Sequence, residues 1–212
     1  SSGLPGGEAI WGDYDNDQRP DLFFFTGAGG LYRNMGEGKF EQVDFPELPT
    51  VNSRGAVWGD FNQDGRLDLF VGGYEVWEQR VHPDVIFLNQ PDGSFKEVWR
   101  SPEGACYSAR GVAAADLNED GKIDVYVSNY RLQPNHLWLN QGEGKFEESA
   151  ESYQAAGIGD GGTINYTGGI QYRVFGHTIG SALGDLDDDG HVDIFVGNFS
   201  HPRAGQDLSL IH

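Results

Sequence analysis

Residues 184–198 read GDLDDDGHVDIFVGN, a stretch that places aspartates at 185, 187, 189 and 193 and a glycine at 190. A single acidic run of this kind is often no more than a solvated turn. The chain, however, contains the pattern four times: WGDYDNDQRPDLFFFTG from Trp11, WGDFNQDGRLDLFVGG from Trp58, AADLNEDGKIDVYVSN from Ala114 and LGDLDDDGHVDIFVGN from Leu183. Four copies in one register indicate an internal repeat rather than four unrelated turns.

A second module recurs between the acidic runs. Its copies are LYRNMGEGKFEQV at 31–43, VIFLNQPDGSFKEV at 85–98 and HLWLNQGEGKFEES at 136–149. Each copy has two short runs around a glycine-containing turn, which is typical of a β-hairpin. One repeat therefore supplies four strands: strand A before the acidic loop, strand B after it, and a C–D hairpin. No window shows sustained helical periodicity, so we predict an all-β fold, a β-propeller built from four-stranded antiparallel blades.

The predicted blades cover residues 8–50, 55–105, 111–150 and 180–212, so that 1–212 form part of a single propeller domain. The fourth blade is incomplete, because LSLIH at 208–212 aligns only with the start of strand C. An open propeller exposes strand edges at both ends. We therefore expect the chain to be a piece of a longer protein, with about three and a half blades of a seven-bladed ring.

Composition excludes several classes of function. The 212 residues carry a net charge of −19, which argues against a nucleic-acid partner because phosphate binding needs a basic surface. No run approaches the ~18 apolar residues of a membrane span. Cys106 is the single cysteine, so no internal disulfide can form. The chain also lacks G-x-S-x-G, H-E-x-x-H and P-loop motifs, and an acidic chain instead suggests metal cations as partners.

The acidic runs are candidate metal sites. Carboxylates and amides occupy positions 1, 3, 5 and 9 of a nine-residue loop, and position 7 can add its backbone carbonyl. The residues in these positions are Asp13, Asp15, Asp17, Arg19 and Asp21; Asp60, Asn62, Asp64, Arg66 and Asp68; Asp116, Asn118, Asp120, Lys122 and Asp124; and Asp185, Asp187, Asp189, His191 and Asp193. Grouped carboxylates repel unless a cation joins them, and side-chain oxygens without His or Cys ligands favour Ca²⁺. We expect the ion to stabilise the connection between strands A and B.

Two details refine this prediction. An EF-hand would need a glutamate at position 12, and the residues found there are Phe24, Val71, Val127 and Val196. The glycine at position 6 of the other loops permits a positive φ, but the first loop has Gln18 there. A left-handed glutamine costs about 1 kcal/mol, so we expect the first site to be distorted or weaker.

The pattern D-x-[DN]-x-D-G-x-x-D, followed by an aliphatic-aromatic strand, resembles the FG-GAP/VCBS repeats of integrin α-subunit propellers. The stretches SNYRLQPNHLWLNQGEGKFEE (128–148) and GHTIGSALGDLDDDGHVDIFVGNFSHP (176–202) are similar to secreted ASPIC-type, cartilage-acidic-protein-like propellers. The resemblance covers essentially the whole chain. It implies calcium at the rim of each blade, an extracellular or periplasmic location where calcium is about millimolar, and adhesion, glycan binding or catalysis depending on the member.

Strand parity predicts a second functional surface. The acidic loops and C–D hairpins should share one face, and the B–C and D–A loops the opposite one. All four lysines map to the first face, whereas arginines and aromatic residues gather on the second, as at a recognition surface. The candidate ligand-binding residues are Arg54, Arg110, Tyr130, Arg131, His177 and His201. We expect a glycan or extracellular protein with carboxylate or sulfate groups, although local pairing with Glu47, Glu103 or Asp84 is an alternative for each arginine.

Three functions remain open from the sequence. The first is a non-enzymatic, secreted, calcium-binding propeller that recognises a glycan or protein. The second is a calcium-dependent polysaccharide lyase or related carbohydrate-active enzyme, in which His177 or His201 acts as the base. The third is an extracellular structural scaffold. Trp11 and Trp58, which lie on strand A, are expected in the core between blades.

Overall fold

The computed structural model describes residues 4–27, 29–49, 52–76, 80–157, 163–165, 171–173, 176–198 and 209–211. Regular structure in these ranges is β-strand apart from one 3-10 turn, η1 (Glu103–Ala105). The prediction of an all-β fold is confirmed. None of the described segments forms a helix with the length and hydrophobicity needed to cross a bilayer.

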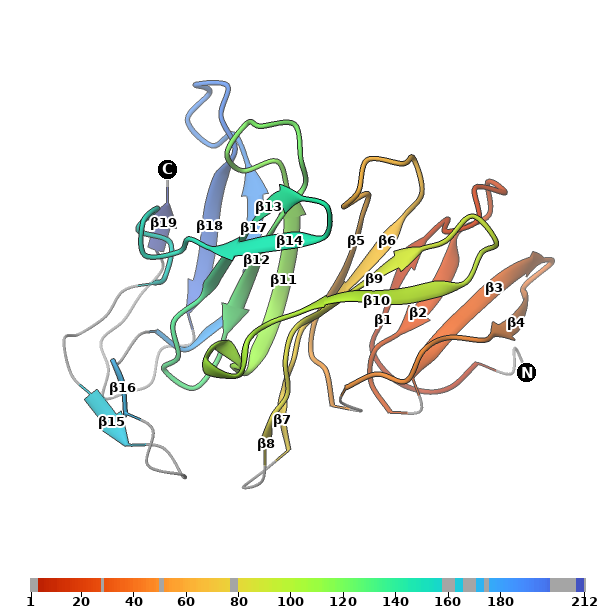
Figure 1. The fold of residues 1–212 in the computed structure, drawn as a ribbon, viewed down its shortest axis with the longest axis horizontal. Coiled ribbons are helices and arrows are strands. Elements are labelled where there is room, and N and C mark those ends of the chain that lie inside the picture. Colours follow the sequence, from red (N-terminus) through yellow and green to blue (C-terminus); the bar gives the residue numbers. More distant parts are fainter. Residues whose placement is uncertain are drawn as a thin grey trace.

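Three complete four-stranded antiparallel sheets and part of a fourth stand side by side (Figure 1). Blade one consists of β1 (Ala9–Gly12), β2 (Asp21–Phe24), β3 (Gly30–Gly36) and β4 (Lys39–Val43). Blade two consists of β5 (Ala56–Gly59), β6 (Asp68–Val71), β9 (Val85–Asn89) and β10 (Phe95–Arg100). Blade three consists of β11 (Ala109–Ala115), β12 (Asp124–Asn129), β13 (His136–Gly142) and β14 (Lys145–Glu148). The fourth sheet contains β17 (Thr178–Gly184), β18 (Asp193–Asn198) and β19 (Ser209–Ile211).

The strand order within each blade follows the chain, and consecutive strands pair antiparallel. Two small ribbons interrupt the repeat and were not predicted. They are β7 (Glu75–Val76) with β8 (Arg80–Val81), and β15 (Thr163–Asn165) with β16 (Gln171–Arg173). The first lies within the B–C connection of blade two, and the second lies in the insertion between blades three and four.

The strands B of blades two and three, β6 and β12, are buried on both faces because each lies between two neighbouring sheets. In blade one, Phe23 packs with Leu69 and Val71 of blade two, whereas Leu22 and Phe24 belong to a separate cluster on the other side. This separation follows from the two-residue alternation of side chains along a strand. The next two interfaces are built in the same way, around Phe70 with Val125 and around Tyr126 with Ile194.

The two strand A tryptophans differ in their surroundings. Trp58 packs into the interface between blades one and two, with its ring 6.1 Å from that of Phe23. Trp11 holds the equivalent place in blade one but is 61% exposed beside Phe40. The prediction of inter-blade core is therefore wrong for Trp11, because no described sheet covers that side of blade one.

Glycines allow the strands A to approach one another. These strands form a series in which β1 lies beside β5, β5 beside β11, and β11 beside β17. A Cβ atom on Gly111 would lie 2.7 Å from the Cα atom of Gly180, and one on Gly55 would lie 2.8 Å from Val112 Cγ2. The three glycines precede the first loop aspartate of their blades by the same number of residues. A side chain at Gly55 or Gly111 would separate adjacent blades, whereas a Cβ atom on Gly180 would meet nothing within 4 Å.

We expect the substitution Gly111→Ala to lower the free energy of unfolding by about 1–3 kcal/mol, because the new methyl group meets backbone that cannot turn away. Gly184→Ala is the matched control, since it lies on β17 with open space around its Cβ position. Urea unfolding followed by tryptophan fluorescence measures both variants. Equal stabilities of the two variants would show that the close approach of β11 and β17 is not required.

Candidate functional site

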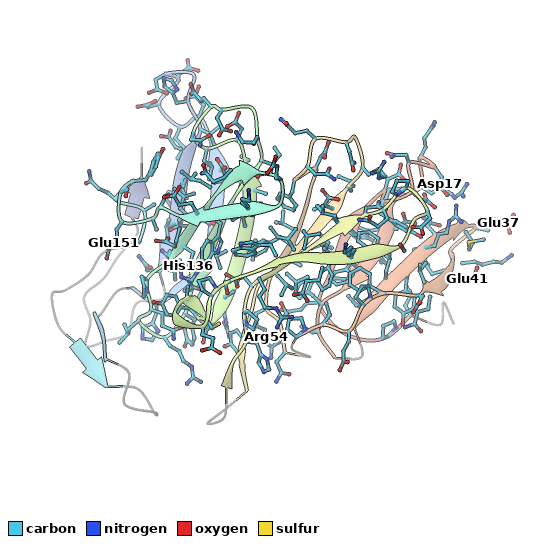
Figure 2. All side chains as sticks on the ribbon, viewed as in Figure 1. Asp17, Glu37, Glu41, Arg54, His136 and Glu151 are labelled. Atoms are coloured by element: carbon cyan, nitrogen blue, oxygen red, sulfur yellow. The ribbon has the colours of Figure 1, made fainter. Side chains whose placement is uncertain are left out.

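The four acidic loops lie at the same end of their sheets, where strand A turns into strand B (Figure 1). They occupy residues 13–20, 60–67, 116–123 and 185–192, between β1 and β2, β5 and β6, β11 and β12, and β17 and β18. Figure 2 shows Asp17 of the first loop on the side of the molecule away from Arg54. The two faces predicted from strand parity are therefore distinct.

Each loop is wrapped around its first aspartate. Asp13 accepts hydrogen bonds from the backbone N–H of Asp17 (3.0 Å) and of Gln18 (2.9 Å), one on each carboxylate oxygen. The same pair of bonds recurs at Asp60, Asp116 and Asp185. Position 5 in turn accepts from the N–H of position 7 in all four loops. Short polar side chains thus replace the backbone–backbone bonds of an ordinary turn.

The position 9 aspartates are buried. Asp21, Asp68 and Asp124 are 0% exposed and Asp193 is 3% exposed. One oxygen of each accepts from the N–H of the position 2 residue, at 2.8–3.2 Å. In blades one to three, the other oxygen accepts from the N–H of an asparagine on strand C, at 2.7–2.8 Å. One carboxylate therefore joins the loop, strand B and strand C.

Burial makes these carboxylates costly to ionise. It raises the pKa of Asp21 and of Asp68 to about 6, against the opposing effect of the backbone N–H donors. It also raises the pKa of Asp124 above its ordinary value. A nearby positive charge stabilises the ionised form of such a buried carboxylate. The loops thus present, next to exposed acids, a buried carboxylate that a cation would stabilise.

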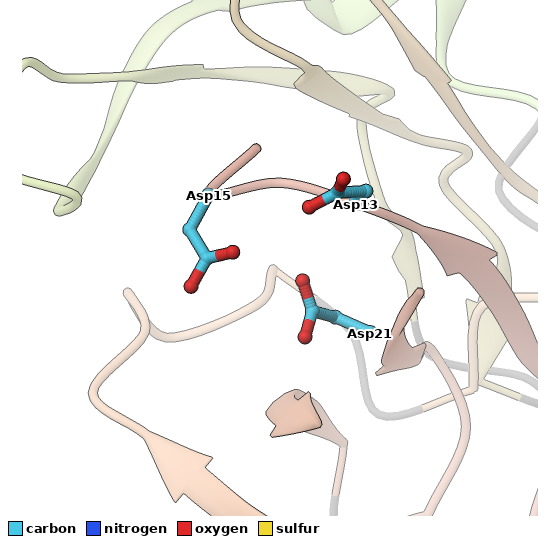
Figure 3. Close-up of side chains that lie close together, drawn as sticks. All are labelled: Asp13, Asp15 and Asp21. Atoms are coloured by element: carbon cyan, nitrogen blue, oxygen red, sulfur yellow. The ribbon is translucent and has the colours of Figure 1, made fainter. Parts of the chain in front are cut away.

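Positions 1, 3 and 9 converge. The carboxylates of Asp13, Asp15 and Asp21 offer oxygens that all lie within 4.8 Å of one another, and Figure 3 shows the three groups facing a common centre. The fourth loop brings together Asp185, Asp187 and Asp193 within the same limit. Loops two and three have Asn62 and Asn118 at position 3. This oxygen-only donor set fits a hard divalent cation.

In the first three loops, the carboxylate at position 5 forms an ion pair with the side chain at position 7. Asp17 and Asp64 pair with the guanidinium groups of Arg19 and Arg66 at position 7, and Asp120 Oδ2 lies 2.6 Å from Lys122 Nζ. In the fourth loop, the imidazole of His191 contacts Glu119 of loop three instead. The side chains at position 7 thus provide charge for neighbouring carboxylates, while their backbone carbonyls stay predicted ligands.

The first loop keeps the geometry of the others. Gln18 has a φ of 68°, close to the 83° of Gly65, and makes the same backbone hydrogen bond. The distortion expected at Gln18 is therefore absent. Position 4 is also left-handed in every loop, with φ values of 57–67° at Asn16, Gln63, Glu119 and Asp188. Sequence reasoning missed this second left-handed residue.

Sequence reasoning also missed three asparagines on strand C: Asn34, Asn89 and Asn140. The amide of Asn89 donates to the backbone carbonyl of Tyr14 in the loop of blade one, at 2.8 Å. Asn140 donates in the same way to the carbonyl of Phe61 in the loop of blade two, at 2.8 Å. Asn89 and Asn140 therefore fasten the first and second loops to the following blade. Their recurrence just before the hairpin turn was the available signal.

On the opposite face, three of the predicted ligand-binding residues meet. The guanidinium of Arg110 lies over the ring of Tyr130, 4.8 Å from its centroid. The Tyr130 and His177 rings are 4.9 Å apart. Arg110 and Tyr130 belong to blade three, and His177 precedes β17 of the fourth sheet. The cluster consequently spans two blades.

The remaining candidates are distributed around this cluster. Arg54 lies over the ring of Tyr74 (5.9 Å) and pairs with Glu8 (3.3 Å). Tyr74, which sequence reasoning did not single out, is the counterpart of Tyr130 in blade two. Arg131 has a φ of 60° in the loop after β12. His201 lies outside the described residues.

Asp84, named above as a local partner for arginine, is instead buried between blades. It accepts from the backbone N–H of Gly73 (2.8 Å) and from the indole of Trp138 (3.0 Å). His136 Nδ1 lies 3.6 Å from the same carboxylate, and His136, labelled in Figure 2, is buried. This network of Asp84, Trp138 and His136 links blades two and three.

Comparison with known proteins gives a consistent result. A family model, the FG-GAP-like repeat, matches residues 13–71, 76–127 and 116–196. Cartilage acidic protein 1 from Xenopus tropicalis is 32% identical over 94 residues, which cover 44% of this chain and 12% of that protein. The Mus musculus protein is 30% identical over 132 residues, 58% of this chain and 18% of its own length. The matched region thus spans less than a fifth of either relative.

A solved structure also aligns with this chain. It comes from work on an Agrocybe aegerita lectin and its specific recognition of non-reducing terminal N-acetylglucosamine. The alignment has a TM-score of 0.45 and 19% identity, and it covers 89% of this chain and 60% of the other.

The asparagine contacts generate a prediction. Asn140→Ala should lower the free energy of unfolding by about 1–3 kcal/mol, because it leaves the carbonyl of Phe61 without its donor in a buried place. Gln141→Ala, an exposed neighbour, should change it by less than about 0.5 kcal/mol. Chemical denaturation measures both. If Asn140→Ala is as stable as Gln141→Ala, the asparagine does not fasten the loops.

Proposed function

Since this chain belongs to the FG-GAP-like repeat family, we propose that it is an extracellular or periplasmic calcium-binding β-propeller module that recognises a glycan or a protein partner. The observation that carries the proposal is the repetition of one loop geometry. Four loops share the same hydrogen bonds around their first aspartate, and each ends on a buried carboxylate.

The donor chemistry supports calcium as the ion. Carboxylates within 4.8 Å of one another repel in the absence of a cation. Calcium accepts six to eight oxygen ligands at about 2.3–2.6 Å in flexible geometry, which suits aspartate and asparagine oxygens from one short loop. The residues at positions 1, 3, 5 and 9 would hold it, joined by the carbonyl at position 7. Bound calcium would supply charge neutralisation and free energy of folding.

The same chemistry supports the proposed location. Sites built from a few exposed oxygen donors bind calcium weakly, with dissociation constants of about 10⁻⁴–10⁻³ M in extracellular modules. Such sites fill where calcium is about millimolar, outside the cell or in the periplasm.

We expect calcium to stabilise the protein. At about a hundredfold excess over the dissociation constant, one site adds roughly 2.7 kcal/mol, so the melting temperature should rise by several degrees and fall again with a chelator. Magnesium should raise the melting temperature less than calcium does, because magnesium requires near-octahedral geometry with ligands at about 2.1 Å.

Asp60→Asn should lower the number of bound calcium ions by about one. Asp44→Asn removes the same charge from an exposed position outside the loops and serves as the control. Scanning calorimetry and equilibrium dialysis give the two readouts. Identical melting curves with calcium and with chelator would refute a structural role for the ion.

The recognition surface is proposed from the Arg110–Tyr130–His177 cluster. A guanidinium that lies over a tyrosine ring keeps its N–H groups available at its edge, and these groups can bind a carboxylate or sulfate through two hydrogen bonds. Arg110 is exposed, and no carboxylate of the described residues forms an ion pair with it. The repetition of the arginine-over-tyrosine pair at Arg54 and Tyr74 extends this surface to blade two.

The cluster also favours one enzymatic alternative. Arg110 could neutralise a uronate carboxylate, and His177, within ring contact of Tyr130, has the chemistry of a base that removes a proton. These are two of the requirements of a polysaccharide lyase, which also needs a proton donor for the departing glycosidic oxygen.

Both functions are tested with uronate-containing and sulfated oligosaccharides. Arg110→Ala should weaken binding by about tenfold or more, the loss expected for one charge-assisted contact, whereas Lys96→Ala on the opposite face removes the same charge without effect. Ultraviolet absorbance of unsaturated sugar ends distinguishes a lyase from a binding module. If no probe binds, or if both variants bind like the wild type, the recognition surface is not at this cluster.

A further inference from the structure

One cation distinguishes the first acidic loop from its counterparts. Arg33 on β3 reaches the loop with Nε 2.6 Å from Asp15 Oδ2 and Nη2 3.5 Å from Asp17 Oδ2. In blades two and three the residue at this place, immediately before the strand C asparagine, is Leu88 and Leu139. A guanidinium therefore extends from strand C into the acidic loop only in blade one, among the three blades whose strand C is described with side chains.

The contact falls on a group that the metal would use. Asp15 belongs to the converging set with Asp13 and Asp21, and its side chain is 17% exposed. The two contacts, to Asp15 and to Asp17, hold the guanidinium in place. The Arg33 side chain is 42% exposed, which leaves it room to move toward solvent when a stronger cation arrives.

The other arginine of this loop does not account for the difference. Arg19 pairs with Asp17 and donates to the backbone carbonyl of Asn34 at 2.9 Å. Arg66 makes the same two contacts in loop two, with Asp64 and with the carbonyl of Asn89 at 3.0 Å. Arg19 is thus a shared feature of the repeat, and Arg33 is additional.

We propose that Arg33 is a built-in counter-ion of the first loop, which holds this loop in shape without metal and makes it the last of the acidic loops to bind calcium. The inference rests on the proposed calcium function. A guanidinium and a divalent cation that share carboxylates compete for them. The competition lowers the calcium affinity of loop one and makes the fold of blade one less dependent on the ion than blades two and three.

The experiment compares Arg33→Leu, which gives blade one the residue of blades two and three, with Arg33→Lys, which keeps the charge. Calorimetric titration with calcium measures the number and affinity of the sites, and melting in excess chelator measures the metal-free fold. Asp15→Ala identifies the first loop in the titration, because it removes the oxygen ligand at position 3 and should abolish the weakest site and leave the others.

Arg33→Leu should strengthen the weakest site by about tenfold, the order expected when one unit charge leaves a partly exposed cluster. The same variant should melt at a lower temperature than the wild type in chelator. Arg33→Lys should resemble the wild type in both readouts. A residue with only a packing role would lower the metal-free melting temperature without strengthening calcium binding.

Two results would overturn the inference, and they are distinguishable. If all calcium sites of the wild type have equal affinity, and if Arg33→Leu leaves these affinities unchanged, the role of Arg33 as a counter-ion is refuted while the calcium function stands. Absence of calcium from all variants would refute both. If Arg33→Leu does not fold, the comparison of Arg33→Lys with Asp15→Ala decides, since a weakest site that survives in Asp15→Ala does not belong to loop one.

Discussion

The buried aspartate at the end of each acidic loop is the interaction on which the rest of the structure depends. Asp68 is 0% exposed, and its two oxygens accept hydrogen bonds from the N–H of Phe61 in the loop and of Asn89 on strand C. A single carboxylate thus fixes the loop, the start of strand B and the end of strand C relative to one another. Its charge is unfavourable in that place, as its raised pKa shows, and the exposed acids beside it increase the unfavourable field. The geometry is therefore strained electrostatically in a way that a divalent cation relieves.

The same loops also join the blades. Asn89 and Asn140 donate to carbonyls in the loop of the preceding blade, and the amide of Gln63 donates to the carbonyl of Gly121 in the next loop at 2.6 Å. His191 of the fourth loop contacts Glu119 of the third. Blade stacking and loop geometry consequently share their hydrogen bonds.

Much of the fold was predictable from the sequence because it is repeated four times. A single DLFV run could be a buried strand or part of a helix. Its recurrence between an acidic loop and a hairpin predicted the order of the strands, and it placed the acidic loops and the C–D hairpins on one face of the molecule. Contacts between repeats could not be predicted in this way. The exposure of Trp11 depends on the absence of a described sheet beside it, and the role of Asn89 depends on a carbonyl 75 residues away. The left-handed backbone at Gln18 likewise could not be predicted from the residue type. There, the backbone N–H donates to the carboxylate of Asp13, as the position 6 N–H does in the other loops, and this bond outweighs the preference of glutamine for a negative φ.

Separation of the two faces explains how a chain of net charge −19 could carry the proposed arginine-based recognition surface. The acidic residues with the highest local density lie in the loops, where position 7 cations and the proposed calcium ions neutralise them. The arginine–tyrosine pairs lie at the opposite ends of the strands, beyond about one Debye length in physiological salt for a strand of this size. Screening therefore leaves the field at Arg110 to be set by its nearest neighbours, Tyr130 and His177, rather than by the total charge. The rigid strands A, held close by Gly55, Gly111 and Gly180, keep these side chains in place. Calcium can in this way stabilise the frame of the surface without contacting what binds to it.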